Sequence, residues 1–500
     1  MLPASKRYSK CNMETKTAKV LIVDIGSGSI RIFVLDTNGE MTLRTRERLH
    51  SQYSKGNEVL IDVSGFSNML TERMTQILND SGYVDAVAIT NQRASTVIYD
   101  NSLRPLHRAI SWQDFRTIGR CMVLAQLNIR LAPNQSATKI EFLLDTLDRN
   151  RVDTKSYKVG TLDNYVAAIL SGGDLHITDL SNASLSGLIK RDLGTYDESI
   201  LEALRIPLEV LPVIGDSIGI LGHASALPGS PPIAAMLGDQ QASMIGQGCI
   251  TTGQMKVTFG TGAMADINTG TASLYKDLLG PNGCTEIVAY KTPDECAYAI
   301  EAIGLSAGSA IEWLCGTLGI ADNPSQLEAM AASVNDSGGV CFVPAQYGLG
   351  TPTWDFGAKA LFSGIGTNTT KPEIARAVLE GIANVGTELI EAASAEAGTS
   401  ENSSPIKVDG GMTTNRTFLQ LLANMTSREI HVAKYAEATS YGAGLAALTA
   451  IGAYEDLSDA VSDYRPSLVI PPTKRHDRKR WLEAKERARN NVPALSAIKF

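Results

Sequence analysis

The feature that most constrains the fold of this chain is a short pattern that occurs twice. Residues 20–34 run from apolar to Gly- and Ser-rich and back to apolar, and residues 255–267 repeat this around Gly260, Thr261 and Gly262. A strand, a tight turn of small residues and a second strand form a β-hairpin. Successive backbone N–H groups in such a turn bind anions, and glycine lets a phosphate approach the main chain. Two such turns on two domains would grip one polyphosphate from opposite sides, which indicates a nucleotide cleft between related halves.

Length and charge narrow the class of protein. A chain of 500 residues exceeds the size at which a single core keeps growing, so we expect two domains. The apolar content of 44% and charged content of 20% are typical of a globular protein. The net charge of −8 argues against nucleic acid or an anionic membrane as a partner, because both require a basic face.

The cysteines and the apolar segments indicate the compartment. The seven cysteines are scattered and lack metal-ligand spacing, which favours reduced thiols. The polar N-terminus has no apolar signal segment, and the stretch 441–454 is too short to span a bilayer. We therefore expect a cytoplasmic protein with no direct membrane insertion.

Strand-length and helix-length segments alternate along the chain, which predicts an α/β fold. The expected helices cover 66–78, 304–318, 372–395 and a segment starting near Thr413, and the expected strands beyond the two hairpins cover 84–90, 233–237, 339–343 and 406–408. We place a polar leader at 1–18, domains at 19–250 and 251–455, and a helical tail at 456–500. Acidic residues interspersed among the basic residues of 474–489 favour a solvated helix over a nucleic-acid or membrane arm.

The first turn does not match two well-known nucleotide motifs. No Gly-Lys-Ser/Thr follows it, and Gly26-Ser27-Gly28 lacks the third glycine of a dinucleotide fingerprint before the chain continues as a strand. Taken alone, the turn could equally belong to an ordinary hairpin. Asp24 at the end of the first strand either terminates it or binds a water of nucleotide-bound Mg²⁺, an ion that keeps most of its waters.

Polar residues at other strand ends supply candidates for chemistry. Phosphoryl transfer to an alcohol needs positioning, charge neutralisation and a group that takes the hydroxyl proton. Asp239 follows an apolar strand and meets the last need, although an Asp there also caps helices. Arg93 ends another strand and points either into the same cleft or to a surface salt bridge. Trp112 is either an apolar wall for the carbons of a polyol or a core residue.

A second glycine-rich loop follows the strand at 406–408. Gly410 and Gly411 allow an adenine ring or a phosphate to lie against the backbone. Asn415, five residues after Gly410, either binds a base or ribose or caps the helix that it precedes.

Taken together, these residues resemble the FGGY carbohydrate-kinase family, and within it the glycerol kinases, over about 20–455. The segments that carry the resemblance are Asn91-Gln92-Arg93, Trp112-Gln113-Asp114, Ser136-Ala137-Thr138-Lys139, Gly160-Thr161-Leu162-Asp163, Thr178-Asp179-Leu180-Ser181-Asn182-Ala183-Ser184, Gly238-Asp239-Gln240-Gln241, Phe259-Gly260-Thr261-Gly262 and Asp409-Gly410-Gly411-Met412. Gln92-Arg93-Ala94 and Ser111-Trp112-Gln113-Asp114 are also similar to an atypical animal branch of these kinases.

The resemblance implies two actin-like (ribonuclease-H-like) domains, each a mixed sheet flanked by helices, that close on ATP. It implies phosphorylation of glycerol to sn-glycerol 3-phosphate with Asp239 as general base. Arg93 and Gln240 would hold the polyol, with Trp112 and Met264 facing its carbons and Asn134 beside it. The implied phosphate and nucleotide contacts, with Asp24 near Mg²⁺, are Ser27, Gly28, Ser29, Arg31, Thr261, Gly308, Glu312, Gly411 and Asn415. A homodimer is one assembly compatible with the resemblance.

The sequence departs from the family pattern at four positions. Ala94 stands where glycerol kinases have Glu, Asn134 where they have Tyr, Met264 where they have Phe, and Glu312 where they have Gln. A site that loses a hydrogen-bond partner for a substrate hydroxyl loses discrimination. Two alternatives to a glycerol kinase therefore stay open: a kinase for another polyol or sugar, and a weakly active nucleotide-binding relative. The Glu is also absent from the animal branch, so its loss does not by itself mean inactivation.

Overall fold

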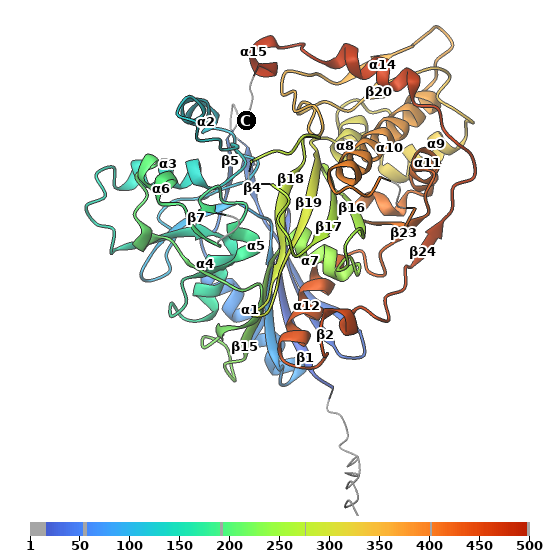
Figure 1. The fold of residues 1–500 in the computed structure, drawn as a ribbon. Helices are drawn as coiled ribbons and strands as arrows, with labels where there is room; N and C mark the ends of the chain where they lie inside the picture. Colours follow the sequence, from blue (N-terminus) through green and yellow to red (C-terminus); the bar gives the residue numbers. More distant parts are fainter. Residues whose placement is uncertain (1–16, 54–57, 191–193, 276, 401–402, 498–500) are drawn as a thin grey trace, which may run out of the picture.

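Two mixed β-sheets form the centre of the molecule, one in each half of the chain (Figure 1). The computed structural model describes residues 17–53, 58–190, 194–275, 277–400 and 403–497. The first sheet has the order β14 (Ile218–His223), β15 (Pro232–Gly238), β6 (Ala86–Asn91), β1 (Lys19–Ile25), β2 (Ser29–Asp36) and β3 (Met41–Arg48). Strands β1 and β2 are antiparallel, whereas β1 and β15 run parallel to β6.

The second sheet repeats this arrangement. Its order is β18 (Thr285–Lys291), β19 (Cys296–Gly304), β17 (Ala263–Gly270), β16 (Met255–Phe259), β22 (Ile406–Asp409), β23 (Ile430–Val432) and β24 (Leu468–Ile470). Strands β16 and β17 form the antiparallel hairpin, and β22 runs parallel to β16 as β6 runs parallel to β1. The sequence-based prediction of two related halves, each opening with a hairpin, is confirmed.

Smaller sheets extend both halves. In the first half they consist of β4 (Ser51–Tyr53), β5 (Val59–Ile61), β8 (Ala109–Ile110), β7 (Thr96–Asp100) and β9 (Tyr157–Thr161), and of the pairs β10 (Ile177–Asp179) with β13 (Val213–Gly215) and β11 (Ile189–Lys190) with β12 (Thr195–Tyr196). In the second half, β20 (Cys341–Val343) pairs with β21 (Leu361–Ser363).

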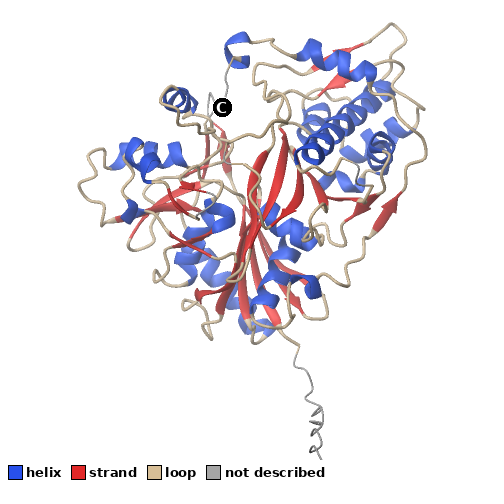
Figure 2. Cartoon of the chain, in the orientation of Figure 1, coloured by secondary structure: helices blue, strands red, loops and turns tan. Residues whose placement is uncertain are grey.

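Helices flank the sheets, as Figure 2 shows. Those of the first half are α1 (Phe66–Ser81), α2 (Ile118–Ala125), α3 (Ala137–Leu147), α4 (Leu162–Leu170), α5 (Leu180–Ala183), α6 (Glu198–Ala203) and α7 (Asp239–Gly246). Those of the second half are α8 (Gly308–Gly316), α9 (Pro324–Ala332), α10 (Lys371–Glu396), α11 (Arg416–Thr426), α12 (Ala438–Ala450), α13 (Leu457–Ala460), α14 (Lys479–Ala488) and α15 (Pro493–Ser496). Single 3₁₀ turns lie at Leu208–Val210 and Gly411–Thr414.

Helix α12 returns from the second half of the chain to the first sheet. It packs against β1, β6 and β15, and its closest neighbour is α7 (Figure 1). The two helix backbones touch, because a Cβ on Gly442 of α12 would overlap the carbonyl oxygen of Ala242 in α7, and one on Gly246 would overlap that of Ala438. One hydrophobic cluster joins α12 to strands of both sheets, from Ile22 to Ala299. The two halves therefore share a buried core beneath the cleft.

Most element predictions hold, and two helices begin a few residues later than predicted. Helices α1 and α10 and strands β6, β15, β20 and β22 match the predicted segments within a few residues. The helix predicted from 304 begins at Gly308, because the preceding residues complete β19. The segment near Thr413 starts as a 3₁₀ turn, and its α-helix follows at Arg416.

The predicted tail helix is present as α14, with one face in solvent and the other packed against the second half. Trp481, Ala484 and Ala488 of α14 are buried, and the Trp481 indole N–H donates to the carbonyl oxygen of Phe342 at 2.9 Å. Most of the charged residues of the segment are exposed, whereas Lys485 is buried and pairs with Glu388 of α10. Of the predicted leader, residues 1–16 lie outside the described residues.

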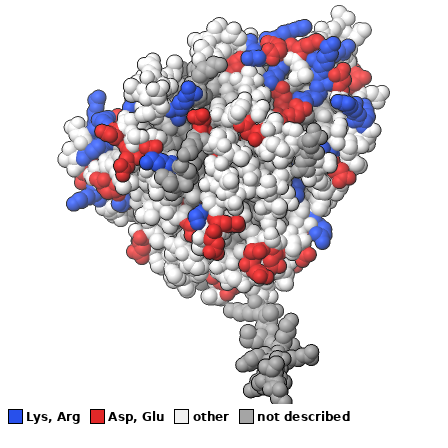
Figure 3. Space-filling view, in the orientation of Figure 1, with Lys and Arg blue, Asp and Glu red and all other residues white. Residues whose placement is uncertain are grey.

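The surface carries charges of both signs. On the face in Figure 3, Lys and Arg side chains lie interspersed with Asp and Glu. Within the described ranges, no helix combines the length and apolarity of a membrane span.

The contact between α7 and α12 gives a stability prediction. We expect Gly442→Ala to lower the melting temperature by about 1–3 °C, because a methyl group at this contact must force the helices apart at a cost of about 1–3 kcal/mol. The control is Gly119→Ala in α2, where nothing lies within 4 Å of the added Cβ. Because alanine favours helix over glycine, the control should be neutral or stabilising. Equal melting temperatures for the two variants, measured by calorimetry, would contradict the prediction.

Candidate active site

Both predicted phosphate turns line one cavity. The cavity measures about 460 Å³ and lies between the β1–β2 turn, the β16–β17 turn and the ends of β6, β15 and β22. Its lining includes the predicted residues Asp24, Ser27, Gly28, Ser29, Arg31, Arg93, Trp112, Asn134, Asp239, Gln240, Thr261 and Met264. Residues separated by more than 200 positions thus meet at one site.

The first turn is stabilised by its own backbone. Gly26 N–H donates to the carbonyl oxygen of Ser29 at 3.0 Å, and the Gly28 carbonyl accepts from Leu49 N–H of the neighbouring chain segment at 3.0 Å. Ser27 and Gly28 are exposed toward the cavity. Their backbone N–H groups are therefore in place for an anionic ligand.

The second turn is held by the start of α8. The N–H groups of Ala307 and Ser309 donate to the carbonyl of Thr261 at 2.9 and 3.1 Å, and Gly308 N–H donates to the carbonyl of Gly260 at 2.9 Å. The carbonyls of the turn are thus bound from behind, and its exposed residues Gly260 and Thr261 face the cavity. A Cβ on Gly308 would lie 2.6 Å from the Gly260 carbonyl oxygen. Gly308 therefore supports the turn by its closeness and does not line the cavity.

The carboxylates of Asp24, Asp239 and Asp409 line the cavity near the turns. Asp24 accepts from Arg31 Nη2 at 2.8 Å and from Ser440 Oγ at 2.5 Å, whereas Asp409 Oδ2 accepts from Ser243 Oγ at 2.7 Å. The other oxygen, Asp409 Oδ1, is buried and accepts no hydrogen bond from the residues described. Mg²⁺ bound to a nucleotide keeps several waters and uses one or two carboxylates. The described residues form no cluster of three or more metal ligands, and the one or two carboxylates that nucleotide-bound Mg²⁺ needs are present in Asp24 and Asp409.

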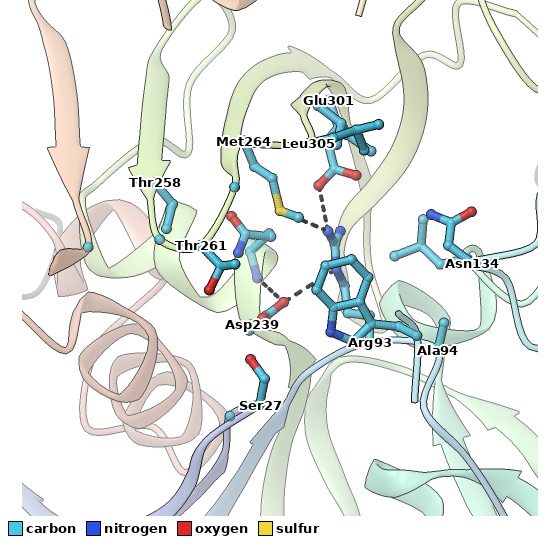
Figure 4. Close-up of a pocket in the computed structure, with 18 of the residues that line it drawn as sticks. Ser27, Arg93, Ala94, Asn134, Asp239, Thr258, Thr261, Met264, Glu301 and Leu305 are labelled. Atoms are coloured by element: carbon cyan, nitrogen blue, oxygen red, sulfur yellow. Dashed lines mark hydrogen bonds and ion pairs between the residues drawn. The ribbon is translucent and has the colours of Figure 1, made fainter. Parts of the chain in front are cut away.

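Arg93 lines the cavity and contacts residues of both halves of the chain. Its Nη2 donates to Glu301 Oε2 at 2.6 Å and its Nε lies 3.3 Å from Asp239 Oδ1 (Figure 4). Its Nη1 donates to Gln241 Oε1 at 3.4 Å. Burial disfavours the guanidinium charge, but the carboxylates of Glu301 and Asp239 outweigh this and raise the pKa of Arg93. The arginine therefore stays charged and joins β6 to β19 of the other half.

Asp239 is the first residue of α7 and directly follows β15. Its Oδ1 accepts from the backbone N–H of Gln240 at 2.8 Å, and its side chain is 30% exposed, toward the cavity. Burial raises the pKa of Asp239, and the charges of Arg93 and Lys256 oppose this increase. A carboxylate of raised pKa at a cavity wall can accept a proton from a bound hydroxyl.

Buried charged residues contact Gln240 and Glu301, two further residues of the cavity lining. Lys256 of β16 lies 2.5 Å from Asp266 Oδ2, with both side chains fully buried, and it donates to Gln240 Oε1 and to Thr258 Oγ1. The Glu301 side chain is 2% exposed, and its burial raises its pKa. The positive charge of the nearby Arg93 opposes this increase. Gln240 and Glu301 are thus fixed by charges that never reach solvent.

The short helix α5 is hydrogen-bonded to the ends of β6 and β15. Asp179 caps α5 by accepting from the backbone N–H groups of Ser181 and Asn182. The Ser181 hydroxyl then accepts from Gly238 N–H at 3.0 Å, and Asn182 pairs with Asn91 at 3.0–3.1 Å. Because Gly238 precedes Asp239 and Asn91 lies two residues before Arg93, the 178–184 segment positions both site residues.

The structure places four predicted nucleotide contacts outside the cavity lining. Glu312 is exposed on α8, and Gly411 is exposed in the 3₁₀ turn. Asn415 caps α11, where its Oδ1 accepts from Phe418 N–H at 2.8 Å. Gly308 supports the second turn, as described above. Their roles toward a nucleotide stay predictions.

Sequence reasoning missed several residues that line the cavity. Glu301 lies inside an otherwise apolar strand, and an acidic residue in such a strand was the signal that could have found it. Asp409 belongs to a segment that carries the family resemblance, and Thr258 lies in the second hairpin, but neither was predicted to line the site. The apolar residues Ile303, Leu305 and Trp354 gave no signal, because their sequence surroundings resemble an ordinary core.

The chain matches the N-terminal domain of the FGGY family of carbohydrate kinases over residues 19–246 and the C-terminal domain of that family over residues 255–451. It is 32% identical to a glycerol kinase of Trichodesmium erythraeum, over 96% of this chain and 99% of the relative. It is 39% identical to a glycerol kinase of a Geobacter species (strain M21), over 74% of this chain and 76% of the relative. The crystal structure of Plasmodium falciparum glycerol kinase with ADP superimposes with a TM-score of 0.84 at 27% identity, covering 97% and 99% of the two chains.

The contact between α8 and the second turn generates a binding prediction. We expect Gly308→Ala to weaken ADP binding at least fivefold, because the added methyl displaces Gly260 and with it the phosphate-facing backbone. Gly316→Ala in the same helix is the matched control, since nothing lies within 4 Å of its added Cβ. Isothermal titration calorimetry measures both. Unaltered ADP affinity in a folded Gly308→Ala protein would refute the supporting role of α8.

Proposed function

The chain belongs to the FGGY family of carbohydrate kinases, and on this basis we propose that it transfers the γ-phosphoryl group of ATP to glycerol, giving sn-glycerol 3-phosphate and ADP. The observation that carries the proposal is the joint cavity of both phosphate turns with Arg93 and Asp239. Its two actin-like domains each supply one turn, so the donor phosphates would lie between them.

On the donor side, the backbone N–H groups of Ser27, Gly28 and Thr261 bind the phosphates, with Arg31 beside Asp24 adding positive charge. Asp24, with Asp409 nearby, would hold a hydrated Mg²⁺ ion, which neutralises charge on the transferred group when bound. The ribose and base would lie toward Gly308, Glu312, Gly411 and Asn415.

On the acceptor side, Arg93 and Gln240 orient the polyol, with Asn134, Trp112 and Met264 around it. Asp239 accepts the proton of the attacking hydroxyl. The oxygen of that hydroxyl attacks the γ-phosphorus in line with the departing ADP. Because Arg93 binds Asp239 as well as Glu301, it fixes the orientation of the base.

The lining favours a second candidate activity on the same scaffold. Ala94 and Asn134 face the acceptor side, where glycerol kinases have Glu and Tyr, so a different alcohol is the alternative acceptor. A catalytically weak relative that only binds nucleotide is the third candidate. Retention of Asp239 and Arg93 in one cavity supports transfer over mere binding.

We place the enzyme in the cytoplasm, as a protein whose partners are ATP and a small alcohol. The six cysteines within the described residues are free, which fits a reducing compartment. A homodimer stays a prediction.

Replacing the base tests the activity directly. We expect Asp239→Asn to lower kcat for ADP release with glycerol by about 10²–10⁴-fold, the contribution typical of a positioned general base. The variant should bind ADP with affinity within threefold of the parent, because the base contacts the acceptor side. A variant that keeps more than a tenth of the parental kcat, measured by a coupled ADP assay, would contradict the role of Asp239.

Glu301 gives a pH prediction. The base must be ionised, so kcat/KM rises with pH through the pKa of Asp239, which burial raises. Glu301→Gln removes a negative charge from the cleft and leaves the Arg93 charge to act on Asp239 alone, and both changes lower the pKa of Asp239. The acidic limb of the pH profile should therefore move to lower pH.

The matched control for that prediction is Glu388→Gln, which removes another largely buried ion pair, with Lys485, outside the site. Its acidic limb should coincide with that of the parent. A limb that stays in place or moves upward in Glu301→Gln would show that Glu301 does not act on the base.

A further inference from the structure

The cavity continues past Arg93 into a region whose walls are mostly apolar. In Figure 4, Glu301 and Leu305 lie on the side of Asp239 that is opposite to Ser27 of the first phosphate turn. The cavity lining includes apolar residues from both halves: Trp112, Leu279, Ile303, Leu305, Trp354 and Phe356. A polyol with a hydroxyl on every carbon would meet few partners there.

Strand geometry makes this wall continuous with the site. Glu301 and Ile303 are two residues apart in β19, so their side chains lie on the same face of the sheet. Leu305 follows at the same spacing, directly after the end of the strand. Met264 lies directly opposite Ile303 on the neighbouring strand β17. The apolar surface therefore begins at the partner of Arg93 and extends away from it.

A loop adds two aromatic rings to the same wall. Thr351 N–H donates to the Ile303 carbonyl at 2.9 Å, and its hydroxyl accepts from Ile303 N–H at 3.0 Å. Trp354 adopts a φ of 47°, which bulky residues rarely do, and its indole N–H donates to the Gly283 carbonyl at 2.6 Å. The ring thus has its polar group satisfied and presents an apolar face beside that of Phe356, with centroids 6.0 Å apart.

The polar groups nearest this wall are already engaged. The Arg93 guanidinium is bound to Glu301, Gln241 and Asp239, and Gln240 Oε1 accepts from Lys256. Ala94 contributes only a methyl group, next to Trp112, whose backbone N–H is bound by Ser95 Oγ at 3.1 Å. Asp239, Gln240 and Asn134 can still bond two or three hydroxyls, and a hydroxyl forced against the wall would be left unpaired.

We propose that the acceptor is a glycerol unit that carries an apolar substituent, such as a short alkyl ether or acyl ester, with the substituent against the wall of Ile303, Leu305 and Trp354. The inference rests on the proposed function and names the substrate class of the same site. In the transfer, the proton of the terminal hydroxyl passes to Asp239, its oxygen bonds to the γ-phosphorus, and the bond from that phosphorus to the bridging oxygen of ADP breaks. The products are the substituted glycerol phosphate and ADP.

The test measures kcat/KM with ATP for glycerol and for its 1-O-methyl, 1-O-ethyl, 1-O-propyl and 1-O-butyl ethers. We expect an increase of about threefold to fourfold per added methylene, the factor for burying one CH₂ group. 1-Monobutyrin, an acyl ester, compared with 1-O-butylglycerol distinguishes an ester source from an ether source. Erythritol and xylitol, which extend glycerol with hydroxyls, should fall below glycerol.

Variants locate the effect. Leu305→Asn should lower the butyl-to-glycerol ratio of kcat/KM at least fivefold, whereas Leu318→Asn, at a leucine 46% exposed beyond α8, should leave it unchanged. Ala94→Glu should lower KM for glycerol and reduce the same ratio, because a carboxylate there would bond a hydroxyl and narrow the apolar region. An unchanged or higher glycerol KM in Ala94→Glu would contradict this.

The outcomes separate the two levels of the argument. No ADP release with any alcohol would refute the proposed function itself. Turnover of glycerol with a flat or falling alkyl series, or a preference for xylitol, would overturn the inference and leave the kinase intact. A rising series that Leu305→Asn does not flatten would also overturn it, because the substituent would then lie elsewhere.

Discussion

The interaction on which the site depends is the buried contact of Arg93 with two carboxylates. Arg93 ends β6 in the first half, Asp239 begins α7 after β15, and Glu301 lies on β19 in the second half. A buried charge is costly unless it is paired, and removing one partner of such a group typically costs about 3–5 kcal/mol. The arginine therefore holds Asp239, the proposed general base, in one orientation and connects it to the opposite domain.

The contact between α7 and α12 stabilises the position of Asp239 relative to both sheets. Gly246 and Gly442 allow the helix backbones to touch, and the shared cluster places strands of both sheets around α12. Asp239 is the first residue of α7, so the helix that carries it is packed against the helix that returns from the other half. The position of Asp239 thus depends on long-range packing as well as on the strand that precedes it.

The difference between local patterns and long-range contacts explains how much of the structure the sequence could predict. The hairpin turns, strands β6 and β15 and helices α1 and α10 follow from local periodicity and turn residues, and the prediction of two related halves rests on the same local signals. The support of the second turn by α8, the return of α12 and the ion pair of Arg93 with Glu301 join residues far apart in sequence, and no local pattern encodes them. The charges of the tail segment predicted the solvent-facing side of α14, whereas its packed side, with Trp481 and the ion pair of Lys485, depends on residues of the second half.

The sequence also predicted only part of the chemistry of the cavity around Ala94 and Asn134. Ala94 and Asn134 could be identified as departures from a family pattern, which left open whether the site had lost an activity or changed its acceptor. The structure adds what surrounds them: an arginine already bound to protein groups, and a wall of aliphatic and aromatic side chains. Loss of a carboxylate leaves a buried hydroxyl unpaired, which disfavours a polar ligand, whereas an apolar substituent gains from leaving water at the same place. One set of substitutions can therefore weaken glycerol recognition and favour a different alcohol without any change at Asp239.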